Sequence, residues 1–352
     1  MRSQAMARVG RTEESLRNRP LGPGLANREN GTFRLQLGRS LRAGWGSQPV
    51  PSHPVLSSPA KLNLSLAVVG RRADGYHDLI SLVSPLALAD TLAAEPGPDG
   101  TASLSCDDPT LPVDASNLVL RAERVFRART GWNGGVRFHL AKRIPRGAGL
   151  GGGSSNATMA LRALDQLAGT RLGDAVLAEL AAELGSDCPL FLFAGPVVLR
   201  GRGERVQPVS PDVAARLAGR PVWLFKPVWG IETPWAFRRL AALRAGTYDD
   251  PAGVESRLTA WFADRAAPLE ALPGNTLERV AFGKYLALPA LVAQVREELG
   301  LPVRMSGSGS CCFAFGPADA TERQLGELTE ALRRRVIAAW GDEAFFAASR
   351  LA

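Results

Sequence analysis

The stretch Pro145-Arg146-Gly147-Ala148-Gly149-Leu150-Gly151-Gly152-Gly153-Ser154-Ser155 decides the fold of this 352-residue chain. Just before it, Val136, Phe138 and Leu140 alternate with Arg137 and His139, and a period of two predicts a β-strand. Just after it, residues 156–168 show the apolar spacing of an amphipathic helix. The glycine-rich loop is therefore expected to join a strand to the N-terminus of a helix.

This loop has the composition of a phosphate site. Glycine lets the backbone adopt positive φ and approach a ligand closely, and the free N–H groups of a first helical turn attract anions. Ser154 and Ser155 can cap the helix, donate to a phosphate or ligate Mg²⁺. A flexible linker is the alternative, although a linker is rarely held between a patterned strand and a patterned helix. The loop lacks the Gly-Lys-Ser/Thr ending of a P-loop.

Composition excludes several classes of protein. An apolar content of 45% and a charged content of 22% are typical of a globular protein, and no stretch approaches the roughly 18 apolar residues of a membrane helix. The chain has four Cys without C-x-x-C spacing and three His. We therefore expect no zinc site, no histidine metal cluster, no membrane partner and a reducing, cytoplasmic setting.

Residues 1–54 stand apart from the rest of the chain. They hold nine Arg and three Glu, a net charge of +6, so the remainder carries only +2 of the total of +8. Their Arg/Gly/Pro/Ser-rich composition predicts a disordered or mis-annotated extension, with an organellar transit peptide as the alternative. Because the basic charge lies in this segment, we expect no nucleic-acid partner.

Polar residues at regular positions mark candidate sites before and after the loop. In residues 59–66, Leu62, Leu64 and Leu66 alternate with Lys61, Asn63 and Ser65, which predicts a strand whose polar face lines a site or faces solvent. Tyr76 and His77 follow an Asp-Gly turn. Asp187 lies between a helix at 174–184 and an apolar run, as a cap or turn residue or as a positioned acid or base.

Alternating strand and helix patterns predict an α+β protein. Further strands are expected at 79–88, 91–94, 197–199, 222–225, 311–315 and 344–349. Further helices are expected at 117–129, capped by Asp114 or Ser116, after Thr233 as N-cap, and at 252–265, 275–284, 289–299 and 320–335. A second Gly/Ser loop, 304–310, precedes the strand at 311–315.

Five stretches of this sequence resemble the GHMP kinases in order and spacing. They are P-A-K-L-N-L (59–64), A-D-G-Y-H (73–77), I-P-R-G-A-G-L-G-G-G-S-S-N-A (144–157), G-S-D-C-P (185–189) and R-M-S-G-S-G-S (304–310). The first two together are similar to the members that phosphorylate a cytidine diphosphate-linked methylerythritol in the non-mevalonate isoprenoid pathway. The departures are Cys188, where an aliphatic residue is usual, and the long N-terminal segment.

The resemblance implies a two-domain fold and a small-molecule kinase. Residues 55–215 would form an ATP-binding domain like ribosomal protein S5 domain 2, and residues 216–352 a ferredoxin-like domain. ATP, with Mg²⁺, would phosphorylate the 2-hydroxyl of the methylerythritol moiety. The enzyme would be a monomer or a weak homodimer.

The resemblance also implies residue roles. Asp187 would act as base or orienting group with Lys61, and the glycine loop, Asn117 and Lys142 would bind ATP. The substrate would be held by Asn63, Tyr76, His77, Thr233 and Phe237, with the cytosine between the two aromatic rings and hydrogen-bonded to His77. The chemistry is consistent, because an attacking alcohol needs a proton acceptor and the phosphates need fixed N–H donors.

Two alternatives remain open from the sequence. One is another GHMP kinase with a different small alcohol, such as homoserine or mevalonate. The other is a non-catalytic nucleic-acid-binding protein, suggested by the basic N-terminal segment and by an S5-like domain.

Overall fold

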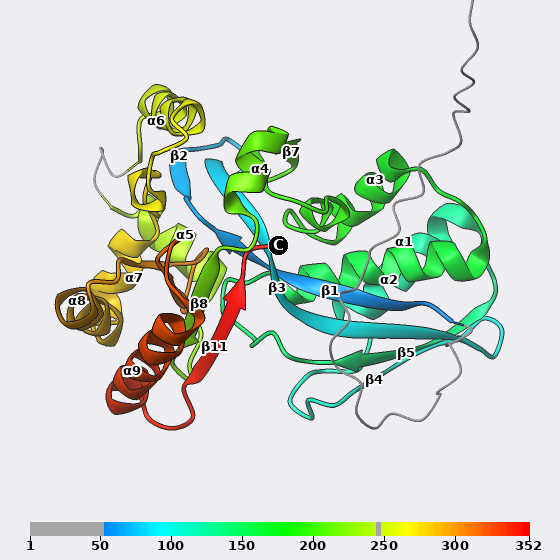
Figure 1. The fold of residues 1–352 in the computed structure, drawn as a ribbon. Helices are drawn as coiled ribbons and strands as arrows, with labels where there is room; N and C mark the ends of the chain where they lie inside the picture. Colours follow the sequence, from blue (N-terminus) through cyan, green and yellow to red (C-terminus); the bar gives the residue numbers. More distant parts are fainter. Residues whose placement is uncertain (1–52, 244–247) are drawn as a thin grey trace, which may run out of the picture. The chain divides into compact units, whose positions relative to one another are not determined.

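Two β-sheets form the framework of the computed structural model, which describes residues 53–243 and 248–352 (Figure 1). The prediction for residues 1–54 therefore lies almost entirely outside the described residues. The first sheet contains β1 (Val55–Asn63), β2 (Ala67–Arg71), β3 (His77–Gly97), β4 (Ala102–Cys106), β5 (Gly135–Ala141), β6 (Val197–Gly201) and β7 (Arg205–Pro208). The second contains β8 (Pro221–Lys226), β9 (Val303–Met305), β10 (Cys312–Phe315) and β11 (Phe345–Arg350).

Helices connect and cover these sheets. They are α1 (Leu118–Thr130), α2 (Gly152–Ala168), α3 (Asp174–Leu184), α4 (Pro211–Leu217), α5 (Thr233–Ala241), α6 (Pro251–Ala263), α7 (Glu278–Lys284), α8 (Ala287–Leu299) and α9 (Glu322–Trp340), with short 3₁₀ helices η1 (Pro189–Leu192) and η2 (Leu269–Ala271). The prediction of an α+β fold is confirmed. The boundary predicted between residues 215 and 216 falls inside the last turn of α4, shortly before β8, and it stays a prediction.

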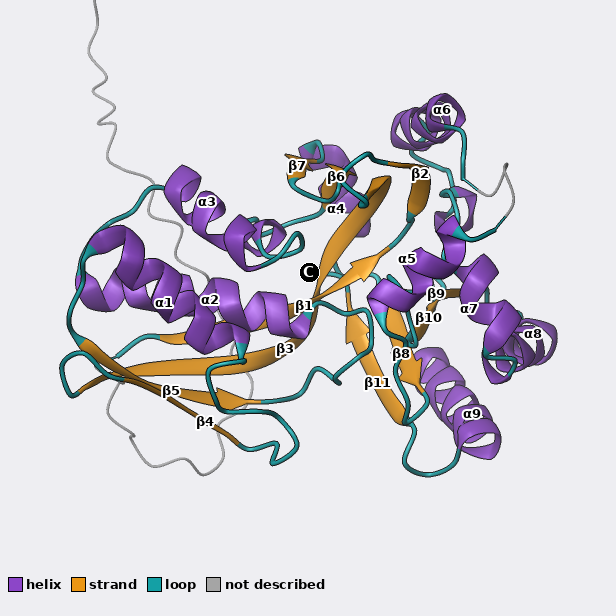
Figure 2. Cartoon of the chain, turned by 180° about the vertical axis from the view of Figure 1, so that it is seen from behind, coloured by secondary structure: helices purple, strands orange, loops and turns teal. Residues whose placement is uncertain are grey.

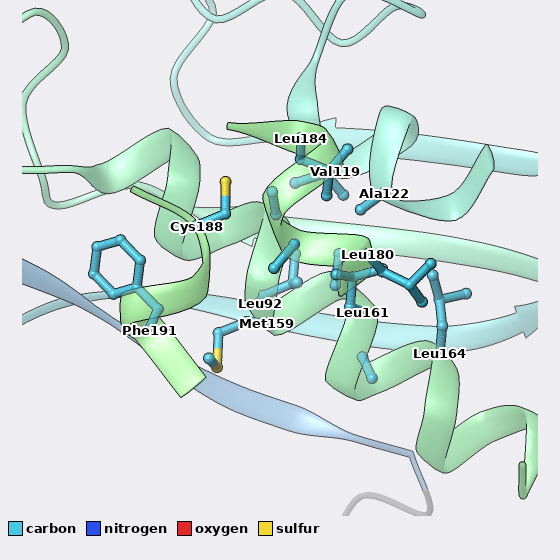
Figure 3. Close-up of a cluster of buried hydrophobic side chains, with 14 of the residues drawn as sticks. Leu92, Val119, Ala122, Met159, Leu161, Leu164, Leu180, Leu184, Cys188 and Phe191 are labelled. Atoms are coloured by element: carbon cyan, nitrogen blue, oxygen red, sulfur yellow. The ribbon is translucent and has the colours of Figure 1, made fainter. Parts of the chain in front are cut away.

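The long strand β3 organises the first sheet. It pairs with β1, β2, β5 and β6, and α1, α2 and α3 cover one face of this sheet (Figure 2). Leu92 of β3, Leu161 and Leu164 of α2 and Leu180 of α3 meet in the core between them (Figure 3). Burial of apolar side chains of this size stabilises the fold by about 1.5–3 kcal/mol each.

The second sheet is apolar on both faces. Along β8, Trp223 and Phe225 face a core shared with α5, α7, α8 and α9. Val222 and Leu224 face the opposite way, toward a core that includes Leu62 of β1 and Leu82 of β3. The period of two along the strand therefore places one set of side chains against the helices and the other against the first sheet.

The sequence prediction of two strands, at 79–88 and 91–94, is wrong, because β3 runs unbroken from His77 to Gly97. Pro85 lies opposite Lys61, at a register shift of β1, between the stretches where β3 pairs with β6 and with β5. The predicted break itself fell at Ala89 and Asp90, which pair with Pro59 and Ser58 of β1, so the ladder continues through it.

Three predicted helix caps are also wrong. The side chain of Asn117, not Asp114 or Ser116, caps α1 by accepting from Val119 N at 3.0 Å. The N-cap of α5 is Glu232, so Thr233 is its first helical residue. The N-cap of α2 is Gly151, with no side-chain hydrogen bond, so the helix begins inside the glycine run rather than after the two serines.

Candidate active site

The glycine loop joins β5 to α2, as predicted, and ends in an uncapped helix N-terminus. Gly147, Gly149 and Gly151 have φ values of 59°, 74° and 70°, a region that favours glycine. Because no side chain caps α2, the N–H groups of its first turn are left for a ligand. Such N–H groups form an anion site.

The second Gly/Ser loop packs directly against the glycine loop. Cys311 N donates to Ala148 O at 3.2 Å, and Ser306 Oγ donates to Gly149 O at 3.3 Å. A Cβ at Gly149 would lie 2.2 Å from Ser306 O, so only glycine allows this approach. The sequence singled out the second loop as a motif but assigned no site residue to it.

Lys61, Asn63 and Asp187 form the polar centre of the site. Lys61 Nζ donates to Asn63 Oδ1 at 2.5 Å and lies 3.6 Å from Asp187 Oδ2. Asn63 Nδ2 in turn donates to Ser81 Oγ at 2.9 Å. The polar face predicted for the strand at 59–66 is thus buried at Lys61 and Asn63 rather than solvated. A buried ammonium between an amide and a carboxylate can hold a hydroxyl group beside the carboxylate.

Aromatic residues also line the site. The rings of His77 and Phe237 have centroids 5.0 Å apart, and the Tyr76 side chain is 55% exposed. The Tyr76 ring faces the guanidinium of Arg202 at 5.0 Å. Burial, and then the charge of Arg71, lower the pKa of His77. The imidazole is therefore held neutral, as a hydrogen-bonding group.

Thr233 contacts the second Gly/Ser loop. Its hydroxyl lies 2.8 Å from Ser308 Oγ in the second Gly/Ser loop. As the first residue of α5, Thr233 is on the same helix as Phe237. The predicted substrate residues on α5 therefore sit beside the second loop.

One cavity of about 810 Å³ connects these groups. Nearly all predicted site residues line it: Lys61, Asn63, Tyr76, His77, Asn117, Lys142, the loop from Pro145 to Ser154, Asp187, Thr233 and Phe237. Ser155 is the exception, because it is fully buried and accepts a hydrogen bond from Ser58 Oγ at 2.8 Å. Asn117 lines the cavity, although its side chain caps α1 and donates to Pro112 O at 2.7 Å.

Lys142 is held by a buried carboxylate. Its Nζ pairs with Asp90, which is fully buried, and lies 3.3 Å from Asn156 Oδ1. Cys188, next to Asp187, is also buried, and burial raises the pKa of its thiol to about 11. The thiol is therefore a neutral packing group.

The protein offers no preformed metal cage in its described residues, where no group of three His, Cys, Asp or Glu could hold an ion. Ser154, in the first turn of α2, lines the cavity and offers one hydroxyl oxygen, the kind of single protein ligand that could join phosphate oxygens around a Mg²⁺. In the part of the chain that the structure describes, no helix has the length and apolar character needed to span a bilayer.

Sequence reasoning missed several residues that complete the site. Arg202 and Ser308 line the cavity, and Tyr248 places its hydroxyl 3.3 Å from His77 Nε2. Asp90 was not predicted, because the strand pattern shows that it follows an apolar run but not that it is buried beside the glycine loop. The one available signal was Gly201-Arg202-Gly203, a glycine-flanked Arg at a hairpin tip.

Comparisons with known proteins identify the class. Two family models match, the GHMP kinases N terminal domain over residues 117–195 and the GHMP kinases C terminal domain over residues 262–338. Homoserine kinase from Cytophaga hutchinsonii, 18% identical, shares the fold with a TM-score of 0.65, covering 88% of this chain and 98% of its own. The glycine loop and the two sheets are thus those of a GHMP kinase.

Three proteins more similar to this chain share one name. 4-Diphosphocytidyl-2-C-methyl-D-erythritol kinase of Synechococcus sp. (strain CC9902) is 37% identical over 81% of this chain and 95% of its own length. The enzyme of that name from Protochlamydia amoebophila is 40% identical over 74% of this chain and 84% of its own length. A crystal structure of 4-(cytidine 5'-diphospho)-2C-methyl-D-erythritol kinase is 35% identical, with a TM-score of 0.66, and covers 85% of this chain and 100% of its own. The chain belongs to the 4-diphosphocytidyl-2-C-methyl-D-erythritol kinase family.

Proposed function

We propose that this protein transfers the γ-phosphoryl group of ATP to the 2-hydroxyl of 4-diphosphocytidyl-2-C-methyl-D-erythritol. The observation that carries the proposal is the position of the Lys61–Asp187 pair in the same cavity as the glycine loop. An acceptor for a hydroxyl proton and a donor site for phosphates are the two parts that phosphoryl transfer to an alcohol needs.

Asp187 and Lys61 act on the attacking alcohol. The hydroxyl oxygen forms a bond to the γ-phosphorus, the bond from that phosphorus to the bridging oxygen breaks, and ADP leaves with the electron pair. Asp187 accepts the hydroxyl proton, and its 43% exposure leaves room for the substrate. Lys61, fixed by Asn63, orients the hydroxyl and stabilises negative charge as the bond forms.

The glycine loop binds the phosphates through the backbone N–H groups that begin α2. Ser154 adds a hydroxyl at the same turn, and Lys142 lies beneath it. When Mg²⁺ is bound to ATP, it neutralises charge on the phosphate oxygens. Fixed N–H donors in a cavity lose little energy to reorganisation, which favours the charged transition state.

The base of the substrate binds at the aromatic end of the cavity. Tyr76 and Phe237 offer ring faces for stacking, and neutral His77 offers hydrogen bonds to the base edge. Stacking alone is tolerant of base identity, so discrimination of cytosine requires the hydrogen bonds. The protein thus acts on a small molecule, and we expect it to work in the cytoplasm as a monomer or weak homodimer.

A panel of alcohols tests this proposal. Purified protein with MgATP is given the cytidyl substrate, homoserine or mevalonate, and release of ADP is followed. We expect a kcat/KM for the cytidyl substrate at least about a hundred-fold above the others, because a site that hydrogen-bonds its substrate rejects analogues without those groups by at least this factor. Turnover of homoserine or mevalonate, without turnover of the cytidyl substrate, would overturn the proposal.

A further inference from the structure

Asp90 of β3 is a buried carboxylate that the proposed reaction does not use. Its side chain is fully buried, and both oxygens are occupied. Oδ1 accepts from Arg143 N at 2.7 Å and from Ile144 N at 2.9 Å. Oδ2 accepts from Asn156 Nδ2 at 2.9 Å and pairs with Lys142 Nζ.

These donors lie on both sides of the glycine loop. Residues 142–144 immediately precede it, and Asn156 follows it in α2. Asn156 Nδ2 also donates to Ser58 Oγ of β1 at 2.8 Å, and Ser58 Oγ donates to Ser155 Oγ. The network therefore fastens both ends of the loop to the neighbouring strands β1 and β3.

The same network places the ammonium of Lys142. A Cβ at Gly152, the first residue of α2, would lie 3.3 Å from Lys142 Nζ. The ammonium thus lies under the N-terminal turn of α2, and the Lys142 side chain is only 8% exposed. Lys142 also lines the cavity. Its positive charge and the N–H groups of the first turn of α2 therefore face the same part of the cavity.

A buried ion pair contributes little net stability, because desolvation of both charges offsets their attraction. A neutral pair of similar shape would stabilise the fold as well as the Asp90–Lys142 ion pair does. The two charges therefore point to a role other than stability. We propose that Asp90 is a positioning residue for the nucleotide, which holds the two ends of the glycine loop and Lys142 in the arrangement that binds phosphate. This inference rests on the proposed function of the loop as an ATP site.

A comparison of single and double variants separates this role from a structural one. Asp90→Asn and Lys142→Met are made singly and together, and the melting temperature and the Kd for ADP are measured by calorimetry. Each single variant leaves a buried charge unpaired, so we expect a lower melting temperature. The double variant is expected to regain most of it, while its affinity for ADP stays about ten-fold below the wild type.

A matched control uses an ion pair away from the loop. Arg200 pairs with Glu255 at 2.7 Å, and Arg200→Met with Glu255→Gln is expected to leave the Kd for ADP unchanged. Recovery of both stability and ADP affinity in the Asp90/Lys142 double variant would overturn the inference. If the double variant does not fold, the test uses Asn156→Ala. This substitution removes one hydrogen-bond donor to Asp90 and creates no unpaired charge. Unchanged ADP affinity in Asn156→Ala would then overturn the inference.

The two proposals fail in different ways. A wild-type protein that binds ADP without phosphorylating the cytidyl substrate would contradict the proposed function and leave the Asp90 measurement valid. A wild-type protein that turns the substrate over, with a double variant that binds ADP normally, would contradict the Asp90 inference alone.

Discussion

Lys61 Nζ lies 3.6 Å from Asp187 Oδ2, and the two side chains differ sharply in exposure, at 5% and 43%. The cation is fixed inside the protein by Asn63 at 2.5 Å, whereas the carboxylate faces the cavity. A fixed cation beside an accessible carboxylate is suited to holding and deprotonating a hydroxyl group. The pair comes from β1 and from the turn before η1, on opposite sides of the glycine loop in the sequence.

Asp187→Asn and Lys61→Met are expected to lower kcat by about 10²- to 10⁴-fold each, because each removes part of the group that prepares the alcohol. The Kd for ADP is expected to change little, since neither residue belongs to the glycine loop. Steady-state kinetics and calorimetry with ADP measure the two quantities. Asp212→Asn, at an exposed ion pair with Arg265, is the matched control and should behave as wild type. Retention of full kcat in Asp187→Asn would contradict the assigned role.

Gly149→Ala is expected to destabilise the protein by about 2–3 kcal/mol and to weaken ADP binding. The added Cβ would lie 2.2 Å from Ser306 O at a φ of 74°, so the two loops would have to separate. Chemical denaturation and calorimetry measure these effects. Gly326→Ala is the control, since its Cβ would meet nothing within 4 Å in the second turn of α9, and it should stabilise the helix by up to about 1 kcal/mol. A Gly149→Ala protein with normal ADP affinity would show that the loop contact is not needed.

The lowered pKa of His77 predicts the direction of a pH effect on substrate binding. Burial and the Arg71 charge lower its pKa below the ordinary value of 6.5. The ring is then neutral above that value, so its contribution to the KM for the cytidyl substrate should be constant there. The folded state binds this proton less readily than the unfolded chain, so the stability that His77 contributes is present above pH 6.5 and is lost as the pH falls through the lowered pKa.

The measurement is KM and thermal stability from about pH 5 to about pH 8, with His77→Gln as the variant that lacks the titrating ring. The difference between the wild-type and His77→Gln pH profiles gives the contribution of the His77 ring. A wild-type KM that improves on acidification, relative to His77→Gln, would mean that the charged ring binds the base.

Tyr248→Phe is expected to raise the KM for the cytidyl substrate by about five-fold with little change in kcat. The hydroxyl lies 3.3 Å from His77 Nε2, and its loss frees the imidazole to rotate while the packing of the ring is kept. Tyr285→Phe, whose ring stacks on Trp229 at 4.9 Å, is the control outside the cavity. Equal KM values for the two variants would show that Tyr248 does not position His77.

The sequence could predict those features that depend on local patterns. The helix at 174–184 and the strand that precedes the glycine loop follow from periodicity, and both were found. The break predicted in β3 at residues 89–90 was wrong because the charged Asp90 is buried there and hydrogen-bonded, and local pattern does not identify its partners. The prediction of a serine cap for α2 was wrong because the last glycines of the loop are already part of the helix.

The composition of the glycine loop alone predicts a phosphate site, whereas the roles of the other candidate residues came from the family resemblance. Nothing in the local pattern places Asp187 beside Lys61, or Ser306 against Gly149. Asp90 and Tyr248 were not predicted as site residues because each contacts the site through a residue that is distant in the sequence. Contacts of this kind are fixed by the packing of whole strands and helices, which residue spacing does not encode.

The central claim is that this cavity phosphorylates the 2-hydroxyl of the cytidyl substrate. The most direct measurement is phosphorus and proton NMR of the product formed with MgATP, which locates the new phosphate and compares its amount with the ADP released. We predict one monoester phosphate on the 2-position oxygen for each ADP. A phosphate on another hydroxyl, or ADP release with inorganic phosphate and unchanged cytidyl substrate, would contradict the claim.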